Sequence, residues 1–138
     1  MRTALISSIL LAMVLCLLPT PLIAGKADVL GVEVRKENGG TYAFSITVRH
    51  DDEGWKHYAD RWEVMSPDGK VLGTRVLSHP HVNEQPFTRS LSGVRIPGQP
   101  TVVTVRAKCN VHGFGGREVT VDLSQSKGDG YEVIPLSR

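Results

Sequence analysis

The clearest strand in this sequence reads Thr41-Tyr42-Ala43-Phe44-Ser45-Ile46-Thr47-Val48-Arg49. Successive side chains of a β-strand point to opposite faces of the sheet. One face of this strand is therefore apolar and carries Tyr42, Phe44, Ile46 and Val48. The preceding Asn38-Gly39-Gly40 is typical of a hairpin turn, because asparagine and glycine tolerate positive φ. We predict a half-buried strand that is entered from a tight turn.

The same alternation recurs along the chain, and no stretch has a helical period. Further strands are expected at residues 29–35, 61–65, 71–77, 87–96, 101–109 and 118–123. In the first of these, Leu30, Val32 and Val34 should share the buried face. Seven strands with apolar faces need two packed layers to cover them. The predicted fold is all-β: an immunoglobulin-like antiparallel β-sandwich of about seven strands.

Residues 1–24 have the features of a signal peptide. Arg2 is followed by an uncharged apolar run from Ala4 to Leu18, and small residues lie at Ala24 and Gly25. Proline at positions 19 and 21 ends the run before the roughly 20 residues that a transmembrane helix needs. We expect cleavage near Ala24, and a periplasmic or secreted mature chain that is free of the membrane. Cys16 follows Leu15, where the lipidation signal of a lipoprotein needs a small residue, so lipidation is not expected.

Residues 25–138 should form a single domain, with residues 124–138 as either an edge strand or a mobile tail. The whole chain has 16 basic and 14 acidic residues, and only Arg2 of these lies in the predicted signal. The mature net charge is therefore 15 − 14, or +1. The charges are interspersed and form no basic stripe, which makes nucleic acid an unexpected partner.

The stretch Ser78-His79-Pro80-His81 predicts a metal site. Residues i and i+2 of an extended segment lie on one side, about 6–7 Å apart, and proline restricts its own backbone and that of the residue before it. Two imidazoles held in this way can chelate one ion. Glu84 is a further ligand, or fixes an imidazole through its second nitrogen. The alternative is a solvated loop with incidental histidines.

Two other loops carry histidines that we expect at the same end of the sandwich. His112 lies in the glycine-rich turn 111–116, and His57 lies in the acidic, aromatic loop 51–60. We predict copper or zinc bound by His79, His81 and His112, with His57 or Glu84 assisting. His50, at a strand end, is the weakest candidate of the five histidines.

Cys109 is the one cysteine left after signal cleavage, so an intramolecular disulfide is excluded. It continues the inward alternation of Val103, Val105 and Ala107, which favours a small buried thiol in the core. However, Cys109-Asn110-Val111-His112 resembles the ligand loop of cupredoxins. That resemblance implies a copper site with an upstream histidine, for which His79 or His81 is available. No methionine follows His112, so an axial methionine would be missing.

Three stretches, residues 54–64, 79–89 and 112–116, together resemble a group of small exported bacterial proteins with an immunoglobulin-like domain. The resemblance extends over most of residues 50–123 and implies fold and export, but no activity. No Gly-x-Ser-x-Gly elbow, phosphate loop, dinucleotide fingerprint or His-Glu-x-x-His helix occurs, so the protein is not expected to be an enzyme. The leading hypothesis is an exported metal-binding protein. The alternatives are a protein-interaction module without metal and a cupredoxin-like electron-transfer protein.

Overall fold

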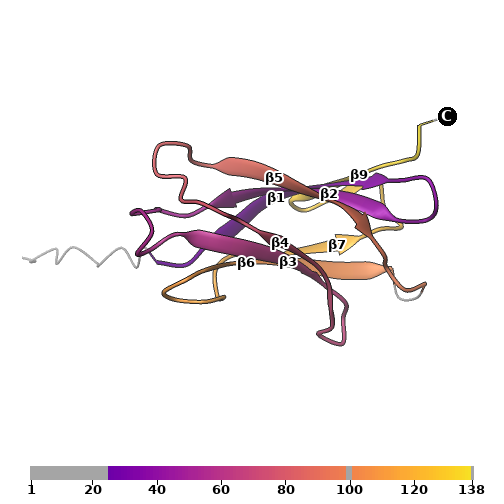
Figure 1. The fold of residues 1–138 in the computed structure, drawn as a ribbon. Coiled ribbons are helices and arrows are strands. Elements are labelled where there is room, and N and C mark those ends of the chain that lie inside the picture. The colour runs from indigo at the N-terminus through magenta and orange to yellow at the C-terminus, as the bar shows by residue number, and fades with distance from the viewer. Residues whose placement is uncertain (1–24, 99–100, 138) are drawn as a thin grey trace, which may run out of the picture.

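Two β-sheets pack face to face in the computed structural model, which describes residues 25–98 and 101–137 (Figure 1). Nine strands are formed, in the order β1 (Asp28–Lys36), β2 (Tyr42–Arg49), β3 (Ala59–Met65), β4 (Val71–Val76), β5 (Phe87–Val94), β6 (Val102–Cys109), β7 (Val119–Asp122), β8 (Lys127–Gly128) and β9 (Tyr131–Ile134). One sheet has the order β5-β2-β1-β9-β8, and the other has β4-β3-β6-β7. The prediction of an all-β sandwich is confirmed. The predicted signal peptide lies outside the described residues.

The core is built from the alternating positions that the sequence indicates. Phe44, Ile46 and Val48 of β2 are fully buried, as are Trp62 and Val64 of β3. Alternate residues of β6 and β7 complete the opposite layer. Burying each large side chain of this kind stabilises the fold by roughly 1.5–3 kcal/mol. The packed core therefore fixes the strand ends from which the loops start.

The inward face of β1 differs from the prediction. Val32 and Val34 are buried, but Leu30 is only half-buried and Val29 takes the inward place instead. The pairing of β1 with β2 shifts register between Val29 and Gly31. An extra residue at such a shift reverses which side chains face inward on either side of it.

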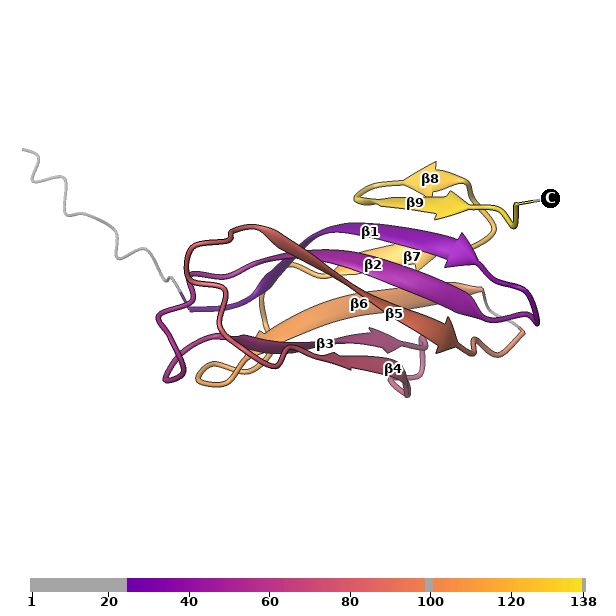
Figure 2. The same ribbon diagram turned by 45° about the horizontal axis from the view of Figure 1, so that its top comes forward.

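The C-terminal segment is more ordered than a free tail. β9 pairs with β1 in parallel, and β8 pairs with β9 as a short hairpin along the edge of the sheet (Figure 2). Every other strand pairing is antiparallel. Val133 is buried against the core, which fixes this segment to the sandwich. Within the described residues, no helix is long and apolar enough to cross a membrane.

Candidate metal centre

One end of the sandwich gathers four chain segments. The register pairs Arg49 with Asp28, Val48 with Phe87, and Ala59 with Cys109. The entry to β1, the loop 50–58, the loop 77–86 and the turn 110–118 therefore all lie at this end (Figures 1 and 2). The prediction that the histidine loops share one end of the fold agrees with these pairings.

His50 and Cys109 are the last inward-facing residues of two strands in opposite sheets. His50 continues the alternation of Phe44, Ile46 and Val48 beyond the end of β2, and only 2% of its surface is exposed. Cys109 ends β6 and is fully buried, as expected. Because the two sheets face each other, both side chains point into the space between them.

A compact group of nitrogen and sulfur atoms fills this space. His50, His57 and Cys109 each offer one ligand atom, and these three atoms all lie within 4.8 Å of one another. The Sγ atom of Cys109 is 3.5 Å from Nε2 of His57. His112 adds a fourth atom, since its Nδ1 lies 3.6 Å from Sγ of Cys109 and 3.1 Å from Nε2 of His57.

These separations suit a single tetrahedral ion. Bond lengths of about 2.3 Å to sulfur and about 2.0–2.1 Å to imidazole nitrogen imply sulfur–nitrogen separations of about 3.6 Å between ligands. The corresponding nitrogen–nitrogen separation is about 3.3 Å. The Cys109 contacts at 3.5 and 3.6 Å match the first value, and the His57–His112 contact at 3.1 Å is slightly shorter than the second.

In His50 and His57, a carboxylate beside Nδ1 leaves Nε2 as the ring nitrogen that faces the cluster. Nδ1 of His50 lies 2.6 Å from Oδ1 of Asp52, so Nδ1 carries the proton and Nε2 keeps its lone pair. Nε2 of His50 is buried without a hydrogen-bond partner. Nδ1 of His57 faces Glu53 at 3.7 Å, which favours the same tautomer there. An unsatisfied buried lone pair is costly in a structural histidine, but it is what a metal ligand needs.

Asp52 holds His50 in place. Its carboxylate is buried and accepts hydrogen bonds from Nδ1 of His50 and from the backbone N–H groups of Ala59 and His81. Histidine ligands commonly donate their second N–H to a carboxylate in this way, which orients the ring and raises its basicity. Asp52 thereby connects the cluster to the loop 77–86.

Asn110 joins the two loops that carry His57 and His112. Its Oδ1 accepts a hydrogen bond from the backbone N–H of Tyr58, and its Nδ2 donates to the carbonyls of Trp55 and Lys56. Its own backbone N–H donates to the Tyr58 carbonyl. Asn110 was not predicted as a site residue, although its place between Cys109 and His112 in the sequence was an available signal.

The turn after β6 directs backbone dipoles at the sulfur. The backbone N–H of His112 donates to Sγ of Cys109 at 3.1 Å, and Cys109 and Gly113 exchange backbone hydrogen bonds that close the turn. Gly113 has a φ of 68°, a conformation that favours glycine. Phe114, next in the turn, is held by the Arg106 guanidinium 3.7 Å above its ring. The turn therefore holds a backbone N–H against the sulfur of Cys109.

The His79–His81 pair has other contacts in this structure. The two rings are 4.5 Å apart between centroids, but His81 is buried and stacks on Phe87 at 3.9 Å. Nε2 of His81 accepts a hydrogen bond from Arg89, which also lies 3.6 Å from Glu84. Burial, followed by the positive charge of Arg89, lowers the pKa of His81.

The structure thus divides the predicted ligands into two groups. His57 and His112 lie in the cluster with Cys109 and His50. His81 instead stacks on Phe87 and accepts a hydrogen bond from Arg89. An ion at Nε2 of His81 would have to displace the Arg89 guanidinium, whereas Nδ1 of His81 is buried without a hydrogen-bond partner. Metal binding by His79, His81 and Glu84 stays a prediction, and the contacts favour the cluster around Cys109. His50 and Cys109 were not predicted as leading ligands. The available signal was that each continues the inward-facing alternation at the end of its strand.

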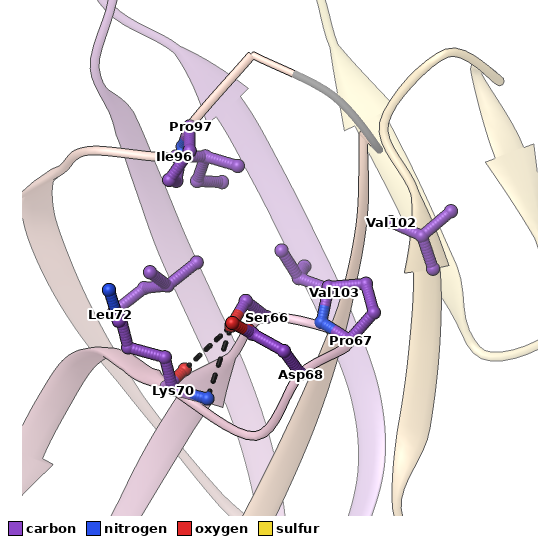
Figure 3. Close-up of a pocket in the computed structure, with 9 residues that line it drawn as sticks. All are labelled: Ser66, Pro67, Asp68, Lys70, Leu72, Ile96, Pro97, Val102 and Val103. Atoms are coloured by element: carbon purple, nitrogen blue, oxygen red, sulfur yellow. Dashed lines mark hydrogen bonds between the residues drawn. The ribbon is translucent and has the colours of Figure 1, made fainter.

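A cleft lined partly by apolar side chains lies at the other end of the sandwich. It has a volume of about 380 Å³ and lies between the β3–β4 turn and the start of β6 (Figure 3). Its walls contain Leu72, Ile96 and Val103 but no histidine or cysteine. This cleft therefore offers no soft metal ligands and is separate from the cluster.

Comparison with known proteins adds one relative. A protein of Halomicrobium mukohataei named "Putative lipoprotein" is 40% identical to this chain over 97 residues. The match includes 70% of this chain and 47% of the relative, so the chain spans about half the length of the curated relative it matches. No family model and no solved structure matches the chain.

Proposed function

We propose that the protein is an exported metal-binding protein that holds one copper or zinc ion with His50, His57, Cys109 and His112. The observation that carries this proposal is the group formed by His50, His57 and Cys109, whose ligand atoms all lie within 4.8 Å of one another. Nδ1 of His112 lies against the ligand atoms of Cys109 and His57, and Nε2 of His50 is buried without a hydrogen-bond partner. A purely structural role would leave that nitrogen unsatisfied. Binding an ion satisfies it.

The ligand set favours copper or zinc. Imidazole binds both ions, and thiolate binds zinc and copper(I) strongly. Among divalent ions, copper(II) has the higher affinity for nitrogen and sulfur ligands. A single Cys109 with three histidines supplies one negative charge when the sulfur is a thiolate. Copper is therefore our first choice and zinc the second.

Export is part of the proposal. The apolar run between Ala4 and Leu18 has the character of a signal peptide, and the similar protein is named as a lipoprotein. In an oxidising compartment a lone thiol is a liability unless it is buried or bound to a metal. Both protections apply to Cys109 in this arrangement.

Electron transfer is the second candidate function. A cysteine and histidines around copper can form a site with intense thiolate-to-copper charge transfer. The direct contacts of Cys109 with two imidazoles favour this alternative over one that uses His79 or His81. An intense visible band in the copper-loaded protein would support it.

The test is metal analysis of exported protein purified without a histidine tag, followed by cobalt substitution. One ion per chain is expected, with a thiolate-to-cobalt band that disappears in Cys109→Ser and persists in His79→Ala. Protein that carries no metal and shows no thiolate band on adding cobalt contradicts the proposal. It would favour an interaction module instead.

A further inference from the structure

The entry to β1 lies directly on the cluster. The carbonyl oxygen of Gly25 accepts a hydrogen bond from Sγ of Cys109 at 3.0 Å. A Cβ placed on Gly25 would fall 2.9 Å from Nδ1 of His112 and 2.7 Å from its Cε1. Nδ1 is the nitrogen with which His112 faces Cys109 and His57. A larger residue at position 25 would therefore push the His112 ring out of its place.

Gly25 is also the residue that follows the predicted signal cleavage site. Hydrolysis of the Ala24–Gly25 bond would consume one water and leave a carboxylate on Ala24 and a free α-amine on Gly25. This amine is attached to the Cα that lies against the His112 ring. A residue spans only about 3.5 Å, so the amine is within one residue's reach of the cluster.

We infer that signal cleavage strengthens the metal site by freeing the Gly25 α-amine as a further ligand, an inference that rests on the proposed function. Before cleavage the same nitrogen is an amide, whose lone pair is delocalised into the carbonyl and does not bind zinc. After cleavage it is an amine, whose lone pair is available to a metal ion once the proton is lost. It gives up its proton to solvent when it coordinates.

A second amine nearby must be distinguished from it. Nζ of Lys26 lies beside Gly115, at 2.7 Å from the place where a Cβ of that glycine would be. Lys26 is exposed and reaches the turn 110–118 from outside, whereas Gly25 is buried against the ligands themselves. The Lys26→Gln variant therefore serves as the matched control.

The first experiment measures the intact mass of the exported protein. A chain that begins at Gly25 is expected. A chain that keeps residues 16–24, with or without lipid on Cys16, overturns the inference, because Gly25 then has no free amine.

The second experiment compares zinc binding by the mature chain and by a form extended to Ile23, using calorimetry in two buffers of different ionisation enthalpy. At pH 7 the mature chain should bind at least tenfold more tightly. It should also release more protons per ion, because an amine gives up its proton when it coordinates, whereas the amide of the extended form stays off the metal. Lys26→Gln in the mature chain should leave both differences unchanged.

The outcomes separate the two claims. Equal affinity and equal proton release by the two forms would overturn the role of the amine and leave the four-ligand site standing. If Lys26→Gln no longer releases the extra proton, that proton comes from Lys26 and not from the Gly25 amine, which would overturn the inference. Absence of zinc binding in both forms would overturn the proposed function, and the inference with it.

Discussion

Replacing Asp52 with asparagine should weaken metal binding without any change to a ligand. The two oxygens of Asp52 accept three hydrogen bonds, two at Oδ1 and one at Oδ2. Asparagine has one acceptor oxygen and one donor nitrogen. In its best orientation the oxygen keeps His50 and Ala59, and the amide nitrogen then faces the N–H of His81.

The cost follows from this arrangement. One buried hydrogen bond to a charged group is lost, which destabilises the fold by about 1.5–3 kcal/mol. His50 keeps a partner, but the partner is neutral. Loss of such a carboxylate typically lowers metal affinity by about 10–100-fold, which corresponds to about 1.4–2.7 kcal/mol of binding free energy.

Competition with a chromophoric zinc chelator measures the affinity, and urea unfolding of the metal-free protein measures the stability. Asp60→Asn is the matched control, since it removes a carboxylate that pairs with Lys108 at 2.9 Å at the same end of the fold. The control should lose little affinity for zinc. If Asp52→Asn binds zinc as tightly as the unchanged protein, His50 is not a ligand that Asp52 orients.

Three further outcomes are expected. His112→Ala should weaken copper or zinc binding by more than tenfold, and His79→Ala should not. Chelator competition on both variants measures the two affinities. If His79→Ala is the weaker binder instead, the metal site is at His79 and His81. Asn110→Ala should lower the free energy of unfolding in urea by about 1–2 kcal/mol, because it removes side-chain hydrogen bonds to three residues of the loop 50–58. It should also lower zinc affinity. Asn110→Asp keeps the acceptor oxygen and should lose less stability and less affinity. The lowered pKa of His81 means that the unfolded chain binds a proton more readily than the folded one. The stability that this residue contributes is complete above the ordinary pKa of 6.5 and is lost as pH falls below it. Between pH 7.5 and 5, the urea midpoint should therefore fall less steeply in His81→Gln than in the unchanged protein. Equal slopes for the two proteins would contradict this.

The sandwich was predictable because alternation is a local property. The inward residues of β2, β6 and β7 follow directly from their period of two. The parallel pairing of β9 with β1 was not predictable, because it depends on a partner about 100 residues away. Local patterns carry no information on which distant edge a strand joins.

The site was predictable in part. His57 and His112 were identified from their loops, and both lie in the cluster. His50 and Cys109 were underrated because an inward residue at a strand end is usually a core residue. Chelation by His79 and His81 requires an extended, exposed segment. In the structure His81 is buried against Phe87 instead, through contacts that local spacing does not reveal.

The central claim is that Cys109 and the surrounding imidazoles bind one ion. X-ray absorption at the metal edge of the zinc- or copper-loaded protein tests it most directly, because it counts the sulfur and nitrogen neighbours. We predict one sulfur at about 2.3 Å and imidazole nitrogens at about 2.0–2.1 Å, with the sulfur shell absent in Cys109→Ser. A shell of nitrogen and oxygen alone, or a sulfur shell that persists in Cys109→Ser, would contradict the account.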